Sequence, residues 1–251
     1  RIMNTGDLSA RLPVESTWDD LSQLAVALNR MLEEIELSVD NIKSVSDSIA
    51  HDLRTPLTRM RQRIEDQFDE QTARPLLNEA DNLLSMFNGL LRIADIETDK
   101  QRSAFNQCEV SLIIDDVIEL YQPVAEQLGI ALEKTLEPIQ MHCDRDLIFQ
   151  CVANILDNAL KFNRQGGKVS VYAGQIKDTI IIRVDDDGIG VDAHQHADIT
   201  RRFFRADKSR NTRGNGLGIA MVSAIIKLHR GKLSFANNPL DTVTGLVSIM
   251  L

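Results

Sequence analysis

Residues that are apolar in all but one case recur in alternating steps of four and three along the N-terminal part of the chain, and this repeat limits the folds that the chain can adopt. They are Leu21, Ala25, Leu28, Leu32, Ile35, Val39, Ile42, Ser46, Ile49 and Leu53. A largely apolar seven-residue repeat of this kind predicts a long helix that buries one stripe against other helices. Further apolar residues at Leu24, Met31 and Val45 widen the stripe beyond that of a two-stranded zipper.

A second helix with an apolar stripe is expected after a short polar break around Asp69 to Thr72. Its apolar positions are Ala73, Leu76, Leu77, Ala80, Leu83, Leu84, Phe87, Leu90, Leu91 and Ala94. Two antiparallel helices of this kind, paired in a homodimer, form a four-helix bundle. The sequence therefore predicts a dimer of helical hairpins in this part of the chain.

After about Ser103 the pattern changes to short alternating segments, which predict a separate α/β domain. Strands are expected at residues 104–108, 130–134, 139–143, 168–173, 179–185, 232–236 and 243–250. Helices are expected at residues 112–128, 146–162 and 217–228. This order predicts a mixed sheet with helices on one face, an α/β sandwich.

Charge, cysteine content and hydropathy exclude several classes of protein. The net charge of −9 and pI near 5.1 argue against nucleic acid as the main partner, because that partner favours a basic surface. The three cysteines have no metal-ligand spacing and suit buried thiols in a reducing cytosol. The chain begins with Arg1 and has neither an apolar run near 18 residues nor a signal-peptide pattern, so we expect a soluble piece of a longer protein.

His51 opens the segment HDLRTPL in the first predicted helix. With the stripe at heptad positions a and d, His51 falls at f and faces solvent, and an ordinary surface histidine remains an alternative. Its neighbours favour a reactive group. Pro56 should kink the helix one turn later. Asp52 could accept a proton from one ring nitrogen and leave the other nucleophilic, and Thr55 could orient a water from the same face.

The segment NILDNALKFN places Asn154, Asn158 and Lys161 on one face of a helix. Amide oxygens are suitable ligands for a hard cation such as Mg²⁺, and a lysine is a point charge for a phosphate. Taken alone, this helix could equally present a polar face to solvent.

The segment VDDDGIGV follows a predicted strand. Gly188 and Gly190 would let the backbone approach a flat ligand closely. Asp186 could accept a hydrogen bond from an exocyclic amine such as that of adenine. The pattern is short, however, and a simple turn is the alternative.

The segment GNGLGIAMV places Gly214, Gly216 and Gly218 at the start of a helix, where backbone N–H groups suit anionic phosphates. It is not a P-loop, because no GK[ST] follows, and no strand leads directly into it as a dinucleotide fingerprint requires. Between the two glycine-rich segments lies a long basic stretch, which predicts either a mobile lid over a polyphosphate or a solvated charge run. Its cations are Arg201, Arg202, Arg205, Lys208, Arg210 and Arg213, with Phe203 and Phe204 among them.

Together these segments resemble the boxes of the bacterial two-component sensor histidine kinases, in that family's order over residues 45–251. HDLRTPLTRM is similar to the phosphoacceptor box, NILDNALKFN to the asparagine box, DDDGIGV and GNGLGIAMV to the glycine boxes, and RRFFRAD to the phenylalanine box. GDLSARLPV and DDLSQLAVALNRMLEEIE are similar to the second half of a HAMP signal-relay module. The resemblance implies a HAMP part at 1–36, a dimerisation and histidine phosphotransfer hairpin at 37–101, and a GHKL-type ATP-binding catalytic domain at 102–251.

The resemblance implies that Nε2 of His51 attacks the γ-phosphate of ATP while Asp52 acts on Nδ1 as base and orienter. The phosphate would then pass to an aspartate of a separate response regulator. Asp52 and Thr55 match the family's phosphatase signature, so Thr55 could align the water that dephosphorylates that regulator.

The resemblance also implies the ATP-binding residues. Asn158 would coordinate Mg²⁺, and Asn154 would support the triphosphate. Lys161 would contact a phosphate, and Asp186 would bind adenine. The other nucleotide-binding positions implied are Phe162, Gly188, Gly190, Arg205, Gly214, Gly216, Leu217 and Gly218. The chain departs from the family at Ile189, often proline, and at Arg201 and Arg202, where an acid is common, but no ligand-bearing group is lost.

Two other classes of function remain open from the sequence. A GHKL ATPase or hydroxyl-directed kinase would need the nucleotide boxes but neither His51 nor Pro56. A non-catalytic dimeric scaffold would need neither Asn158 nor Asp186. The HAMP resemblance further implies that the chain is the cytoplasmic portion of a bacterial inner-membrane protein, with transmembrane helices and a sensor domain preceding it.

Overall fold

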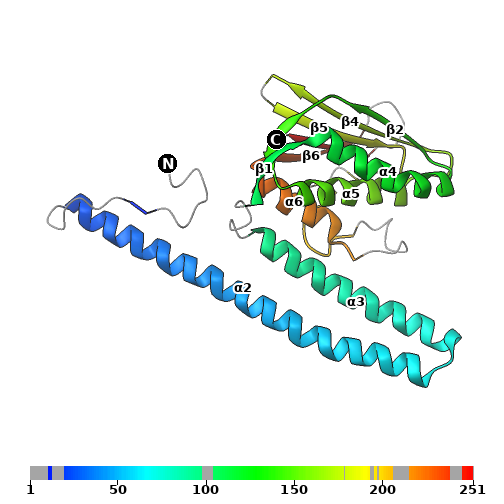
Figure 1. Cartoon of the computed structure of the whole chain (residues 1–251), viewed down its shortest axis with the longest axis horizontal. Helices are drawn as coiled ribbons and strands as arrows, with labels where there is room; N and C mark the ends of the chain where they lie inside the picture. The colour runs from blue at the N-terminus through cyan, green and yellow to red at the C-terminus, as the bar shows by residue number, and fades with distance from the viewer. Residues whose placement is uncertain are drawn as a thin grey trace. The chain divides into compact units, whose positions relative to one another are not determined.

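The structure is a computed structural model of the 251-residue chain. It describes residues 11–12, 20–97, 104–177, 179–192, 195–196, 198–205, 215–237 and 245–250. The chain divides into two compact units, Arg1–Lys100 and Gln101–Leu251. The first is blue to cyan and the second green to red in Figure 1.

Two long helices make up the described part of the first unit, α2 (Asp20–Gln67) and α3 (Glu70–Glu97). They pack side by side as an antiparallel hairpin, as predicted (Figure 1). Asp69 ends the turn between them, because its Oδ1 accepts the backbone N–H groups of Gln71 and Thr72, both at 3.1 Å. The predicted break around Asp69 to Thr72 is therefore shorter and earlier, since Asp69 already caps α3.

The helix α2 passes through Pro56 without interruption, and the kink expected at Pro56 stays a prediction. The segment HDLRTPL is helical in its backbone. The side chains of His51 and Asp52 lie outside the described residues. The expectation that His51 faces solvent therefore stays a prediction. Thr55 is exposed.

A single hairpin covers only part of the apolar stripe among the described side chains. The buried residues include Ala73, Ala80, Ile93 and Ile96 of α3. Large apolar side chains left exposed include Leu24, Leu28, Met31, Leu76 and Leu83. Exposed apolar positions along a heptad stripe are typical of helices that pair further, while the dimer itself stays a prediction.

The second unit contains each strand and helix predicted after residue 103, with ends shifted by a few residues. In chain order they are β1 (Asn106–Glu109), α4 (Val110–Leu128), β2 (Ala131–Leu136), β3 (Gln140–Cys143), α5 (Arg145–Lys161), β4 (Lys168–Ile176), β5 (Thr179–Asp186), α6 (Gly218–Leu228), β6 (Lys232–Asn237) and β7 (Gly245–Met250). Hydrophobic periodicity is local information, which explains why it locates these elements well.

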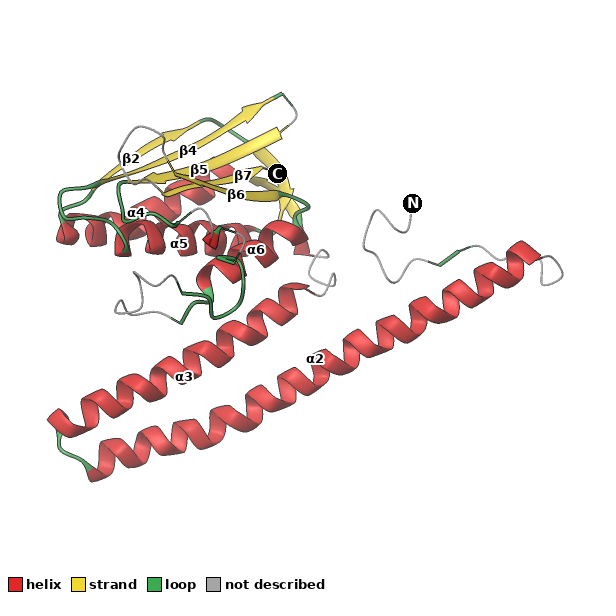
Figure 2. Cartoon of the chain, turned by 180° about the vertical axis from the view of Figure 1, so that it is seen from behind, coloured by secondary structure: helices red, strands yellow, loops and turns green. Residues whose placement is uncertain are grey.

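The main sheet has the strand order β2-β4-β5-β7-β6. The β2–β4 pair is parallel and the other pairs are antiparallel, while β1 and β3 form a separate antiparallel ribbon. Helices α4, α5 and α6 lie on one face of the sheet (Figure 2). The predicted α/β sandwich is confirmed.

The core lies between the sheet and these three helices. Inward side chains alternate along β4 and β5, and the register places Val171 opposite Val184 and Ala173 opposite Ile182. The three cysteines are free thiols, and Cys143 and Cys151 are buried as predicted, whereas Cys108 is half-buried. Within the described ranges, no helix has the length and hydropathy needed to cross a membrane.

Candidate nucleotide-binding site

Helix α5 carries the first group of candidate ligands. Asp144 caps it, because Oδ1 accepts the N–H groups of Asp146 at 2.9 Å and Leu147 at 3.1 Å. The helix is anchored by buried residues, namely Leu147, Ile148, Cys151, Val152, Ile155, Leu156, Ala159 and Leu160. Asn154 and Asn158 remain half-buried outside this anchored face, as the spacing predicted.

The two asparagines meet the first residue of α6. A Cβ added at Gly218 would lie 3.3 Å from Oδ1 of Asn154 and 3.5 Å from Nδ2 of Asn158. Nδ2 of Asn154 donates to the carbonyl oxygen of Gln150 at 2.8 Å, so its Oδ1 is the atom turned toward α6. The start of α6, whose first N–H groups have no partner within the helix, thus lies against two amide side chains.

The loop after β5 packs on the other end of α5. Oδ1 of Asp186 accepts the N–H of Gly188 at 2.8 Å. A Cβ at residue 188 would lie 2.5 Å from the carbonyl oxygen of Phe162, so glycine is required for this close approach. Ile189 donates its N–H to the same oxygen at 3.1 Å, a bond that proline could not make.

The segments on either side of residues 206–214 are bound to each other. Phe203 donates its N–H to the carbonyl oxygen of Gly216 at 3.0 Å. Both residues have positive φ, 63° at Phe203 and 69° at Gly216. A Cβ at residue 216 would lie 2.7 Å from the carbonyl oxygen of Phe204. The phenylalanine box and the second glycine box therefore form one junction beside α6.

Lys161 is the basic residue in the last turn of α5. Its Nζ lies 5.2 Å from the ring centroid of Phe162. Burial lowers the pKa of Lys161, the charge of Asp157 raises it, and the charge of Arg205 lowers it again. Two cations that repel each other beside half-buried amides favour the binding of a polyanion.

The described residues that the resemblance assigned to nucleotide binding meet in separate contacts. Asn154 and Asn158 lie against Gly218, Asp186 and Phe162 lie against Gly188, and Lys161 lies near Phe162 and Arg205. Gly216 contacts the phenylalanine box, and Leu217 is the buried residue before α6. Gly190 follows Gly188 in the same loop with φ 59°, and Gly214 lies outside the described residues. His51, Asp52 and Thr55 belong to the other unit.

Sequence reasoning missed two backbone groups of this site. The carbonyl oxygen of Phe162 is the acceptor that holds the loop at Ile189, and the N–H of Phe203 holds the junction at Gly216. Only the paired glycine boxes signalled such close approaches, because backbone hydrogen bonds leave no residue-type pattern of their own.

Comparison with known proteins found two matching families and several relatives. Residues 143–249 match the family of histidine kinase-, DNA gyrase B-, and HSP90-like ATPases, and residues 1–37 match the HAMP domain. The signal transduction histidine-protein kinase BaeS of Escherichia coli K12 is 28% identical, over 98% of this chain and 54% of BaeS. The chain spans about half the length of the curated relatives it matches.

Solved structures are also similar. The mycobacterial sensor histidine kinase MprB is 28% identical with a TM-score of 0.55, over 58% of this chain and 97% of that one. The histidine kinase AdeS of Acinetobacter baumannii has a TM-score of 0.61 over 80% of this chain and 96% of that one, and at 23% identity it shows the fold alone.

The fold and the matches define a chain that joins a HAMP domain to a histidine kinase-type ATPase domain. Over most of its length it is similar to bacterial sensor histidine kinases. The ATPase match implies that the second unit binds ATP.

Proposed function

We propose that this chain is the output module of a sensor histidine kinase, which uses ATP to phosphorylate His51 and passes the phosphate to an aspartate of a response regulator. One observation carries the ATP site: the side chains of Asn154 and Asn158 converge on Gly218 at the start of α6. That arrangement combines amide oxygens with the N–H groups of a helix N-terminus, which suits a triphosphate.

Each end of the site supports a different part of the nucleotide. The Asp186 loop is held tightly to the end of α5 and would bind adenine, with Gly188 and Gly190 leaving room for the base. Lys161 and Arg205 would contact phosphates, because their repulsion falls when an anion lies between them. The junction of Phe203 and Gly216 would support the basic segment over the ligand.

Mg²⁺ suits the donors in this site. Among the described residues, no group of three or more His, Cys, Asp or Glu side chains could hold a metal ion. Mg²⁺ commonly takes one or two protein oxygens and completes its shell with phosphates and water. The half-buried amide of Asn158 could supply one such oxygen, and Mg²⁺ there would neutralise charge on the phosphates.

The reaction that we propose transfers the γ-phosphoryl group to a ring nitrogen. The lone pair of Nε2 of His51 forms a bond to the γ-phosphorus, and the bond from that phosphorus to the β–γ bridging oxygen breaks. ADP leaves with the bonding electrons. Asp52 would accept the proton from Nδ1, so that the phosphorylated ring is neutral.

Three further properties belong to the same proposal. Thr55 lies one turn after His51 and would align a water for dephosphorylation of the regulator. The exposed residues Leu24, Leu28 and Met31 support pairing of two hairpins in a homodimer. The division at residues 36 and 101, and a location on the cytoplasmic side of a bacterial inner membrane, stay predictions.

Incubation of the chain with ATP labelled on the γ-phosphate tests the proposal. We expect an acid-labile, alkali-stable label that disappears in His51→Gln and persists in the control His142→Gln, which alters an exposed histidine of the other unit. An acid-stable label would support a hydroxyl-directed kinase. Absence of both label and ATP binding would support a scaffold, and label retained in His51→Gln would exclude His51 as the acceptor.

A further inference from the structure

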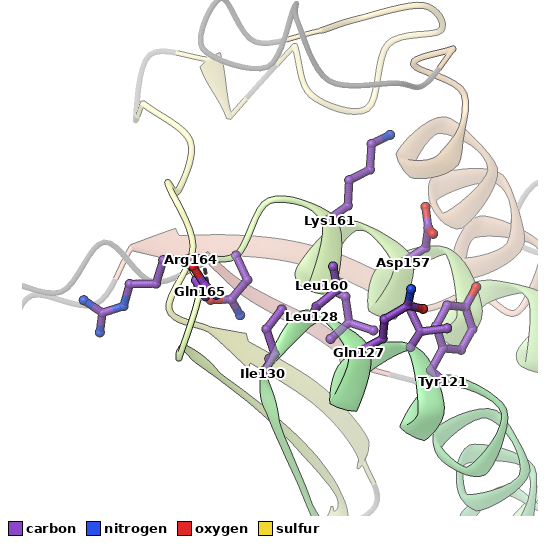
Figure 3. A pocket seen from close by; sticks show the side chains of 11 residues that line it. Tyr121, Gln127, Leu128, Ile130, Asp157, Leu160, Lys161, Arg164 and Gln165 are labelled. Atoms are coloured by element: carbon purple, nitrogen blue, oxygen red, sulfur yellow. Dashed lines mark hydrogen bonds between the residues drawn. The ribbon is translucent and has the colours of Figure 1, made fainter.

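A groove lies between the C-terminal halves of α4 and α5, with a volume of about 580 Å³. We call it the α4–α5 groove. Its apolar lining includes Val124 and Leu128 of α4 and Leu160 of α5. Its polar lining includes Tyr121, Asp157 and Lys161, which are labelled with Leu128 and Leu160 in Figure 3. This volume is within the range of about 300–1,000 Å³ that is usual for small-molecule sites.

The groove is separate from the nucleotide site. Asn154 and Asn158 are turned toward α6, whereas Asp157 and Leu160 line the side of α5 that packs on α4. Among the described candidate ligands of the nucleotide, Lys161 alone lines the groove. The two sites therefore adjoin and share one side chain.

The apolar wall of the groove is open to solvent. Val124 is 43% exposed and Leu128 is 44% exposed, although both are large apolar side chains beside the buried Leu160. Covering such a wall with an apolar ligand is favourable, by about 25 cal/mol for each Å² removed from water. The ligand should therefore carry an aromatic or aliphatic body.

The charges at the groove favour a negative group on that ligand. The charged lining residues are Asp157, Lys161 and Arg164, a net charge of +1. Arg164 has Asp187 as a partner at 3.6 Å, a pair in which the arginine is exposed and the aspartate half-buried. Burial lowers the pKa of Lys161, the charge of Asp157 raises it, and the charge of Arg205 lowers it, so a bound anion would add to Asp157 in stabilising the ammonium form.

We propose that the α4–α5 groove binds a small amphipathic carboxylate, with its apolar body against Val124 and Leu128 and its carboxylate at Lys161. The presence of the groove does not depend on the proposed kinase activity. Its coupling to nucleotide does rest on that proposal, because both ligands would compete for the charge of Lys161. Binding of either should therefore weaken the other by the same factor, about fivefold or more.

Titration of the full chain with 2-naphthoate, followed by backbone amide NMR and naphthoate fluorescence, tests the groove. We expect saturable binding with shifts at Tyr121, Gln127 and Gln165, and weaker binding of the neutral 2-naphthalenemethanol. Val124→Glu should weaken naphthoate binding about tenfold, because it replaces an apolar contact of the naphthyl body with a charged side chain. Leu120→Glu is the matched control, since Leu120 is 60% exposed on the same helix but does not line the groove.

Several results would overturn the proposal. One is absence of saturable binding. Another is equal weakening by the two glutamate variants, and a third is shifts centred on Gly188 and Gly218, which would place naphthoate in the nucleotide site. The same titration with the ATP analogue AMP-PNP tests the coupling separately. If AMP-PNP fails to bind, the proposed nucleotide site fails while naphthoate binding still decides the groove.

Discussion

Phe105 lies flat against the imidazole of His229, with ring centroids 4.5 Å apart and planes 18° from parallel. Nδ1 of His229 bonds the carbonyl oxygen of Ile225 at 2.8 Å, and Nε2 accepts the N–H of Asp144 at 3.4 Å. Because Asp144 caps α5 and His229 ends α6, His229 connects the ends of these two helices, and Phe105 packs against it. The stack holds Phe105, near the start of the second unit, against the end of α6.

Phe105→Ala should destabilise the second unit by roughly 1–3 kcal/mol, through lost burial and a lost ring stack. Denaturant unfolding followed by circular dichroism measures this change. Leu112→Ala serves as the comparison, since Leu112 is 58% exposed on α4 and should cost under about 1 kcal/mol. If the two substitutions lower the free energy of unfolding equally, the ring stack contributes no more to stability than an exposed apolar side chain.

Gly218→Ala should separate nucleotide affinity from stability. The new Cβ would lie 3.3 Å from Oδ1 of Asn154 and would displace that amide, so ATP affinity should fall about fivefold or more. Alanine in place of glycine at the start of α6 favours the helix by up to about 1 kcal/mol, so stability should hold or rise. Calorimetric ATP titration and thermal unfolding test both expectations, with Ser223→Ala on α6 as control. Unchanged ATP affinity would place the triphosphate elsewhere.

Asp144→Ala should cost about 1 kcal/mol of stability, because α5 loses the acceptor for the N–H groups of Asp146 and Leu147. Asp144→Asn keeps a capping oxygen and should recover most of that loss. Chemical denaturation of the two variants side by side provides the measurement. If asparagine is no better than alanine, the charge of Asp144 matters more than its cap.

Stability should fall as the pH rises above about 8.5, the ordinary thiol pKa. Burial raises the pKa of Cys143 to about 12, with the neighbouring Cys108 adding to the effect, and burial also raises the pKa of Cys151. In alkaline solution the unfolded chain releases thiol protons that the folded chain retains. Each such thiol then lowers the free energy of unfolding by at most about 1.4 kcal/mol per pH unit, until its folded pKa is reached.

The alkaline slope is measured by urea unfolding at a series of pH values between about 7 and 10. Cys151→Val should make the fall in the free energy of unfolding with pH less steep, since a buried thiol is replaced by a side chain that does not ionise. A slope unchanged in this variant would mean that Cys151 does not contribute to it.

Local patterns were sufficient for the elements of this protein. The heptad stripe predicted α2 and α3, and alternating hydrophobicity predicted the strands of the sheet, because each depends on residues a few positions apart. The glycines at residues 188 and 216 were predicted to serve a ligand, whereas the structure shows them close to the carbonyl oxygens of Phe162 and Phe204, which lie far from them in the chain. The turn was displaced to Asp69 because a single capping carboxylate determined where α3 begins.

What the sequence by itself determined is therefore the helical hairpin, the α/β sandwich and the identity of most candidate nucleotide ligands. Only the tertiary structure decided that Asn154 meets Gly218, that Phe105 covers His229, and that α4 and α5 leave a groove at Lys161. These contacts join residues far apart in the chain, and they depend on how helices pack over a sheet. Residue spacing encodes the face of a helix, whereas packing selects what that face touches.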